Sequence, residues 1–472
     1  AYQAALTDER RRELEADLKS GALRGVWSTN ALELGVDVGG LDAVVLDGYP
    51  GTRMQTFQQG GRAGRGTDPA LVILVGGEDQ LDQYVMNQPD VLFDRPPEQA
   101  VTNPTNETLL PGHVKSAASE RWLRPEDDRY FGDGLPDIVT DLEASGDLDR
   151  RTTDAGIRWL SDGGGSPQQD TNLRSIDDHE IKLKAGGDII ARLGLDDALR
   201  DAHPGAIYHH QGTTYEVTDL DLDRGVATLD RTWADYFTRV KHDKTITVEE
   251  DLAERSLAAR DDVPVRFASV TMRKRITGYE RRDSSSGKLI GERSLDLPET
   301  SLETKAYYFT VPRDVERAML GEAIDADGDA GGETVTDGGP SPDRSSTDGP
   351  LPAGVDAGDL PGGIHAAEHA MISMMPFEYL CDRRDIGGVS TPVHPHTEKA
   401  TIFVYDGYPG GVGLARAGFH GIEDLMAVTL DMLRSCDCAH GCPACVQSPH
   451  CGNGNDPLDK DLATYLLDEL TA

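Results

Sequence analysis

Five of the six cysteines lie close together near the end of the chain, at positions 436, 438, 442, 445 and 451. Such density in a chain that lacks a secretory-type leader indicates a metal site rather than disulfides. Thiolates at C-x2-C spacing can close a tetrahedral Zn²⁺ site with bonds of about 2.3 Å. Because Cys436 and Cys438 are one residue apart, one of them is expected outside the ligand set. We predict that the ligands are Cys438, Cys442, Cys445 and Cys451.

Three alternatives to this ligand set stay open at the level of sequence. His440 and His450 are competing ligands within the same segment. The cysteines could instead hold an iron–sulfur cluster, or remain free thiols. Cys381 stands apart from the others and is expected to be buried rather than reactive.

A second group of side chains suited to chemistry is the segment QQGGRAGRG at residues 58–66. Its Arg62 and Arg65 are three residues apart, so one face of a helix or its entry loop would carry both guanidinium groups. Arginine offers a rigid fork that suits phosphate and keeps its charge. Such a pair can stabilise a transferring γ-phosphate as an arginine finger. A solvated Gly/Arg loop is the alternative for this segment taken alone.

The segment STNALELGVD, which begins at residue 28, followed by QxxGRxGR resembles motifs V and VI of superfamily 2 nucleic-acid helicases. Both motifs belong to the second RecA-like lobe of that family. The resemblance implies that Thr29 contacts a backbone phosphate of the nucleic acid, and that Gly35 and Asp37 lie near the nucleotide. It also implies catalytic roles for three motif VI residues: Gln58, Arg62 and Arg65.

The first-lobe motifs of such helicases do not occur in this sequence. It holds no GxxxxGK[ST] and no DEAD/DEAH-type carboxylate pair after a strand. We therefore expect this chain to be inactive alone as an ATPase, with ATP and Mg²⁺ bound only once a first RecA-like lobe completes the site. The chain opens with Ala1 in what reads as the middle of a domain, and we expect that lobe upstream.

The cysteine segment and three segments before it resemble the C-terminal zinc-binding domain of the mitomycin-repair-factor type of DEAD/DEAH-box DNA helicase. These segments are GGIHAAEHAMISMMPF, CDRRDIGG, FVYDGYPGGVGLA and GCPACVQSPHCGNGNDPLDK. That family also includes the fungal and plant relatives of the RecQ4-like helicases. The resemblance implies an ATP-dependent DNA translocase, 3′ to 5′, linked to DNA repair. The alternative is a zinc-containing DNA-binding or scaffold module without motor activity.

One motif inside this region fits a different chemistry. His365, Glu368 and His369 match H-x-x-E-H, the pattern of inverzincin metallopeptidases. On a helix the two histidines would share a face, and Glu423 is a conceivable third ligand. We expect a packed polar cluster here; a secondary metal site, a DNA contact and a peptidase are the alternatives.

A short basic run, MRKRITGYERR at residues 272–282, stands out against the charge of the chain. Tyr279 could offer a stacking surface among its cations. A solvated strand face balanced by neighbouring acids is the alternative. The candidate contacts to DNA are Arg273, Lys274, Arg275, Arg281 and Arg282.

The chain as a whole is strongly acidic, with 46 Lys+Arg against 83 Asp+Glu and a formal net charge of −37. Taken alone, this charge argues against an ordinary nucleic-acid binder. Lysine is scarce beside arginine, 11 against 35, and acidic residues are spread throughout. We interpret this composition as that of a halophile's cytoplasmic protein, since molar salt shortens the Debye length to about 3 Å. The sequence contains no run of about 18 apolar residues, so it predicts no membrane-spanning helix.

The elements expected to position these groups follow from hydrophobic periodicity. A helix should start near Asp8 and stop at Gly21, and strands are predicted at 25–29, 41–49 and 70–76 in a parallel α/β sheet. Residues 135–151 fit a winged helix, 206–229 a strand meander, and 264–282 further strand. The predicted fold class is thus an α/β RecA-like second lobe, an α+β accessory region and a small zinc-binding domain. The predicted boundaries are 1–80, 81–175, 176–324, a disordered insert at 325–362, and 363–472.

Overall fold

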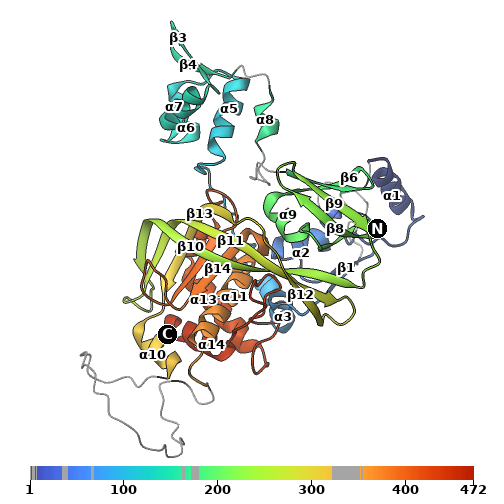
Figure 1. The fold of residues 1–472 in the computed structure, drawn as a ribbon, viewed down its shortest axis with the longest axis vertical. Coiled ribbons are helices and arrows are strands. Elements are labelled where there is room, and N and C mark those ends of the chain that lie inside the picture. Colours follow the sequence, from blue (N-terminus) through green and yellow to red (C-terminus); the bar gives the residue numbers. More distant parts are fainter. Residues whose placement is uncertain are drawn as a thin grey trace, which may run out of the picture.

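The computed structural model describes residues 2, 6, 8–33, 41–64, 69–161, 165–171, 180–321, 351 and 355–472. Within them the chain forms four packed parts arranged as in Figure 1. None of the described helices combines the length and apolar character needed to cross a membrane.

The N-terminal part pairs two strands in parallel, Ala43 with Leu71 through Asp47 with Val75, as the sequence predicts. The helix expected after residue 7 runs from Asp8 to Ser20, followed by Gly21 at φ 75°. The strand expected at 25–29 is reduced to a single bridge between Tyr2 and Ser28. The elements are α1 (Asp8–Ser20), η1 (Asn30–Leu32), β1 (Ala43–Asp47), α2 (Arg53–Gly60), β2 (Leu71–Val75), α3 (Gln80–Asn87) and α4 (Val91–Asp94).

The second part stands out from the rest of the molecule at the top of Figure 1. Three helices precede an antiparallel hairpin, and Leu123 forms a bridge to Trp159 beside the hairpin. Its own small core packs Val114, Leu135 and Val139 around Trp159. The elements are α5 (Leu110–Glu120), η2 (Pro125–Asp127), α6 (Asp128–Phe131), α7 (Leu135–Ser145), β3 (Asp149–Thr153), β4 (Gly156–Leu160) and α8 (Pro167–Asp170).

The third part is a five-stranded sheet in the order β6-β5-β9-β8-β7. It confirms the meander predicted at 206–229, because β7, β8 and β9 pair antiparallel in succession. The elements are β5 (Glu180–Ala185), β6 (Asp188–Gly194), α9 (Leu195–Asp201), β7 (Ile207–His210), β8 (Thr213–Asp221) and β9 (Val226–Arg231).

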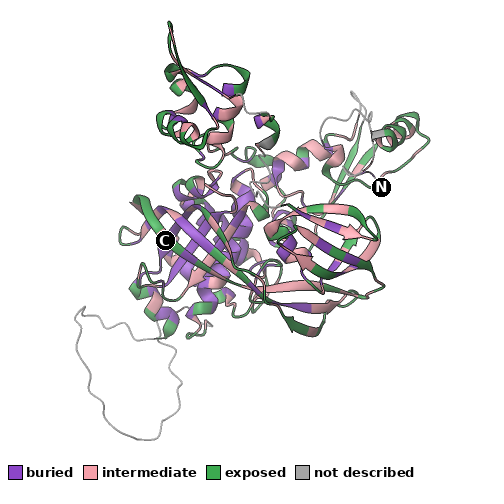
Figure 2. Cartoon of the chain, turned by 45° about the horizontal axis from the view of Figure 1, so that its top comes forward, coloured by how far each residue is buried: buried purple, intermediate pink, exposed green. Residues whose placement is uncertain are grey.

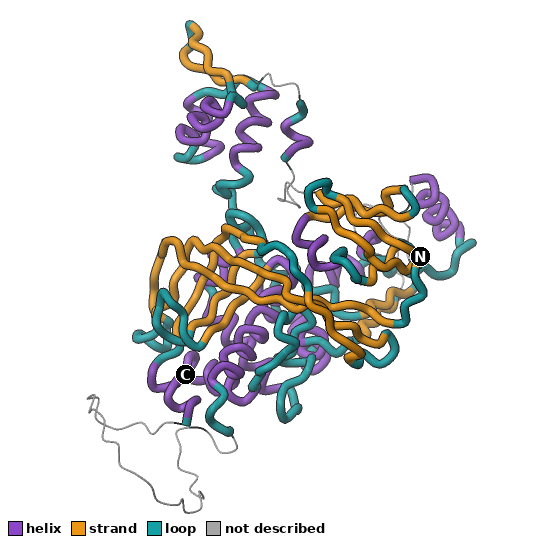
Figure 3. Tube along the Cα trace, viewed as in Figure 1, coloured by secondary structure: helices purple, strands orange, loops and turns teal. Residues whose placement is uncertain are grey.

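The fourth part holds the main core, a six-stranded sheet with helices packed on one face (Figure 3). Tyr307, Phe309 and Val404 point to the helices, and Tyr308 and Phe403 to the opposite face, as the two-residue period of a strand requires. The strands are β10 (Tyr236–Ser256), β11 (Pro264–Asp283), β12 (Leu289–Ser294), β13 (Thr300–Thr310), β14 (Ile386–Thr391) and β15 (Thr401–Asp406).

The helices of this part are α10 (Arg313–Leu320), α11 (Leu360–Glu378), η3 (Arg383–Asp385), α12 (Leu414–His420), α13 (Ile422–Ser435) and α14 (Lys460–Thr471). Helix α11 is the central one, since it is mostly apolar and almost entirely buried. The carboxylate of Asp359 caps it by accepting the N–H of Gly362. Buried residues gather in this part of the molecule, whereas the α5–α8 part is mostly exposed (Figure 2).

Strand β13 pairs with β15, so one sheet spans residues 236–406 and crosses the boundary predicted between 176–324 and 363–472. Most of the predicted insert at 325–362 lies outside the described residues. Its last residues belong to the fold, because α11 begins at Leu360. Gly358, near the end of the predicted insert, contacts the chain that precedes the insert: its N–H donates to the carbonyl oxygen of Met319 at 2.8 Å.

Candidate functional site: a four-cysteine centre and a helicase motif segment

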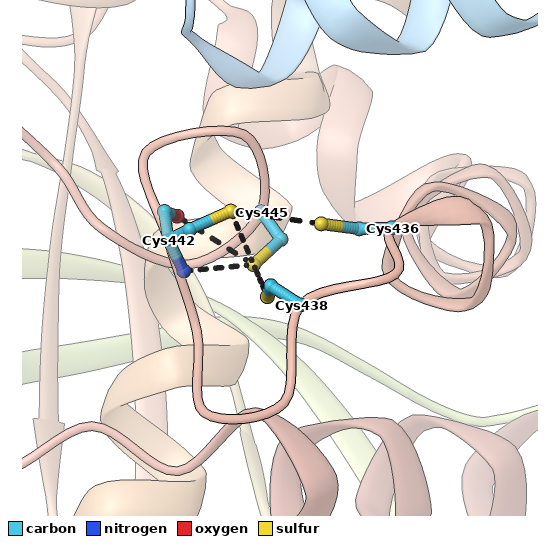
Figure 4. Close-up of side chains that lie close together, drawn as sticks. All are labelled: Cys436, Cys438, Cys442 and Cys445. Atoms are coloured by element: carbon cyan, nitrogen blue, oxygen red, sulfur yellow. Dashed lines mark hydrogen bonds between the residues drawn. The ribbon is translucent and has the colours of Figure 1, made fainter.

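The loop between α13 and α14 brings four thiols together. The sulfur of Cys436 lies 3.6 Å from that of Cys442, and the sulfur of Cys445 lies 3.5 Å from Cys438 and 3.8 Å from Cys442 (Figure 4). All four sulfurs lie within 4.8 Å of one another. Sulfurs bound to Zn²⁺ at about 2.3 Å in a tetrahedron would be about 3.8 Å apart. The cluster therefore fits a structural Zn²⁺ site.

This geometry corrects one predicted ligand. Cys438, Cys442 and Cys445 lie in the cluster, but its fourth member is Cys436 and not Cys451. Cys436 directly follows the last residue of α13, and the loop folds back so that a C-x-C pair faces a C-x2-C pair. Two closely spaced cysteine pairs were the signal in the sequence for this set.

The surroundings of the four-cysteine centre suit its charge. Burial raises the pKa of Cys445, whereas hydrogen bonds from the neighbouring thiols outweigh burial and lower the pKa of Cys438. Lys460, 7% exposed, donates to the carbonyl oxygens of Cys436 and Cys438. Four thiolates around Zn²⁺ carry a net negative charge, so a buried ammonium beside them is favourable.

Cys451 lies instead with the two histidines of the H-x-x-E-H motif. Its sulfur is 3.6 Å from Nε2 of His365, and the ligand atoms of Cys451, His365 and His369 lie within 4.8 Å of one another. Burial raises the pKa of Cys451, but hydrogen bonds from His365 and His369 outweigh it and lower the pKa to about 5. Glu423 is not part of this group, because both of its oxygens bind the guanidinium of Arg255 at 2.5 and 2.6 Å.

The two helicase-like segments lie side by side in the N-terminal part. Just after the STNALELGVD segment, the N–H of Leu41 donates to the carbonyl oxygen of Arg62 at 3.2 Å, and the N–H of Gly64 donates to that of Leu41 at 2.7 Å. Glu33 joins them further: its carbonyl oxygen accepts Nε of Arg62 at 3.1 Å, and its carboxylate accepts Nε2 of Gln59 at 3.0 Å. Sequence reasoning missed Glu33, which is 8% exposed.

The remaining residues of these motifs are placed as follows. Thr29 is exposed and caps η1 by accepting the N–H of Ala31. Gln58 lies half-buried on α2. Gly35, Asp37 and Arg65 lie outside the described residues.

The basic run on β11 is partly neutralised by acids. Lys274 pairs with Asp196 at 2.6 Å and Arg282 with Glu280 at 2.7 Å. Arg273 and Arg275 are exposed, and the guanidinium of Arg281 stacks over the ring of Tyr236. Tyr279 is buried with its ring centroid 4.7 Å from that of His203, so it offers no stacking surface to a base.

Comparison with known proteins defines the class of protein to which this fold and site belong. Residues 1–67 match the helicase conserved C-terminal domain, and residues 367–446 match the MrfA Zn-binding domain. The helicase YprA of Bacillus subtilis is 30% identical over 94% of this chain and 54% of its own length. The helicase hrq1 of Schizosaccharomyces pombe is 24% identical over 99% of this chain and 42% of its own.

A solved structure supports the same assignment. The crystal structure of the DUF1998 helicase MrfA bound to DNA matches with a TM-score of 0.56 and 28% identity, over 98% of this chain and 56% of that one. The chain thus spans about half the length of the relatives it matches. Over nearly its whole length this chain is therefore similar to helicases of the MrfA type.

Proposed function

We propose that this chain is the C-terminal part of an ATP-dependent DNA helicase that moves 3′ to 5′ and acts in DNA repair. In this proposal a first RecA-like lobe upstream supplies the remaining half of the ATP and Mg²⁺ site. MrfA, which this chain resembles, has been crystallised with DNA and AMPPNP. The observation that carries the proposal is the direct contact between the motif V and motif VI segments through Glu33 and Arg62.

This contact offers a route by which nucleotide binding is coupled to the contact with DNA. Arg62, the proposed γ-phosphate contact, is hydrogen-bonded to the backbone of Glu33, four residues from Thr29, the proposed DNA phosphate contact. A shift of Arg62 on nucleotide binding would therefore move the segment that carries Thr29. In the same proposal Arg65 is the arginine finger and Gln58 a further catalytic residue of motif VI, while Gly35 lies by the nucleotide and Asp37 near the ribose.

Two further proposals concern the accessory region and the setting. The helix-rich order α5-α6-α7-β3-β4, with the bridge at Leu123, supports a winged helix over residues 110–160. The net charge of −37 supports a cytoplasm of molar salt as the working environment. There, screening lowers self-repulsion, so a local cluster such as Arg273 and Arg275 can contact DNA despite the total charge.

The test is DNA-stimulated ATPase of the full-length protein, with its upstream lobe, in molar KCl. We expect Arg65→Ala to lower turnover on the order of a thousandfold, because the transition-state charge loses its cation. The matched control is Arg24→Ala, an exposed arginine of the same part, which should retain full turnover. Full turnover of Arg65→Ala would overturn the arginine-finger role. A coding sequence without an upstream P-loop would favour a zinc-containing DNA-binding or scaffold module.

A further inference from the structure

The cluster of His365, His369 and Cys451 is separate from the four-cysteine centre and has its own donor set. The two histidines are one turn apart on α11, with ring centroids 4.3 Å apart. The cysteine arrives from the loop before α14. The domain match at 367–446 includes neither His365 nor Cys451. These three residues bring two imidazoles and one thiol to a single point.

Both imidazole rings are oriented in the same way by backbone carbonyls. Nδ1 of His365 lies 2.8 Å from the carbonyl oxygen of Pro457, and Nδ1 of His369 lies 2.9 Å from that of Val446. A carbonyl oxygen only accepts, so each Nδ1 carries a proton, and Nε2 is the atom of each ring that is left to bind a metal once it is deprotonated. Metal-binding histidines are commonly fixed by this kind of outer hydrogen bond.

The thiol is held in place from two sides. Its sulfur accepts the N–H of Asn455 at 3.3 Å, and Asn455 adopts φ 67°, which turns the loop around the sulfur. Nη2 of Arg239 on β10 donates to the carbonyl oxygens of Ser448 and Cys451 at 3.2 and 3.1 Å. Cys451 is 7% exposed. The sheet therefore fixes this loop against α11 without using the sulfur itself.

We propose that His365, His369 and Cys451 bind a second zinc ion, distinct from that of the four-cysteine centre. Two imidazole nitrogens and a thiolate are ligands that Zn²⁺ prefers, whereas Mg²⁺ and Ca²⁺ prefer oxygen. Three protein ligands leave the fourth tetrahedral position open, as in catalytic rather than structural zinc sites. All three residues line a cavity of about 1390 Å³, as does Glu368. The open position is thus accessible to water or a small ligand.

The four-cysteine centre and the proposed second site share one loop and are connected through its backbone. Val446, next to Cys445, gives its carbonyl oxygen to His369. Glu368 is 6% exposed, and its Oε2 accepts the hydroxyl of Ser390 at 2.7 Å, so it is not a member of the ligand cluster. Each site can therefore be removed by substitution of its own ligands.

The experiment is elemental analysis of the full-length protein purified after growth with added zinc. We expect two zinc ions per chain in the wild type, and one in Cys451→Ser and in His365→Gln. Cys442→Ser should lose the ion of the four-cysteine centre, and Cys381→Ser is the matched control that keeps both. One zinc ion in the wild type, or two in both Cys451→Ser and His365→Gln, would overturn the proposal. Copper at this site would overturn the identity of the metal.

A second measurement does not depend on how any variant folds. X-ray absorption at the zinc edge of the wild-type protein should show nitrogen ligands at about 2.0–2.1 Å beside sulfur at about 2.3 Å. A shell of sulfur alone would mean that only the four-cysteine centre binds zinc, and would contradict the proposal.

Discussion

Strands β1 and β15 have similar apolar sequences, AVVLD and TIFVYD, but very different surroundings. All six residues of β15 are buried, because β13 and β14 flank it and helices α11 and α12 pack nearby. Val45 of β1 is 61% exposed and Leu71 of β2 is 55% exposed. An apolar run therefore indicates a strand, while its contribution to stability depends on the neighbours that cover it. The proposed motor part, which contains β1 and β2, and the zinc-binding part, which contains β15, differ in the same way in how far their strands are covered.

The largest loss of stability should follow from removing a ligand of the four-cysteine centre in the zinc-binding part. Cys445→Ser removes a ligand that is 0% exposed, and a structural zinc site contributes on the order of 10 kcal/mol to folding. We expect loss of one zinc ion and a large fall in the melting temperature. Elemental analysis together with calorimetry measures both. Cys381→Ser is the control, and an unchanged melting temperature for Cys445→Ser would show that the centre does not stabilise this part.

The next effect concerns the joint between the two parts. Arg53 of α2 is buried beside Glu98, with Nε 3.4 Å from Oε1, and its Nη2 donates to the carbonyl oxygen of Phe377 on α11 at 3.2 Å. Arg53→Ala leaves the Glu98 carboxylate buried without its cation, so we expect a loss of about 3–5 kcal/mol in urea unfolding.

The matched control for this joint is Arg10→Ala, which breaks an exposed pair with Glu13. Exposed pairs contribute about 0–1 kcal/mol. Equal losses for the two variants would show that the Arg53 contact does not hold the parts together.

The smallest loss of stability is expected from a Val→Ala substitution made once in β15 and once in β1. Val404→Ala in β15 creates a cavity at a residue that is 0% exposed, and should cost about 2 kcal/mol. Val45→Ala in β1 should stay within about 0.5 kcal/mol, because the side chain is mostly in solvent. Chemical denaturation of both variants measures the difference. A cost at Val45 as large as that at Val404 would mean that β1 is covered in solution.

Local patterns in the sequence predicted local elements well. The helix at Asp8–Ser20, the strands around Val45 and Ile73, and the meander of β7–β9 all follow from periodicity and turn residues. The joining of β13 to β15 was not predictable, because the low-complexity segment between them suggests a boundary. Pairing of distant strands depends on tertiary contacts that no local pattern encodes.

The same limit explains the error in the ligand set. Cys451 follows Cys445 by six residues, and spacing alone allows both to bind one ion. In the fold, Cys451 lies beside α11 and away from the other four cysteines. Its sulfur is close to His365 and His369, which precede the loop by about eighty residues. The motif H-x-x-E-H was visible in the sequence, but its partner was not. Glu33 was missed for the same reason, since its role depends on contact with Arg62.

The hydrogen bond between Gly358 and Met319 has a practical consequence for protein engineering. Because the backbones of Met319 and Gly358 are held together, the residues between them could be exchanged for an affinity tag or a fluorescent reporter. Doubling the length of a flexible loop costs only about 0.6 kcal/mol. The junction is thus an attachment point at which this protein could be labelled while its sheet and its metal-binding loop are left intact.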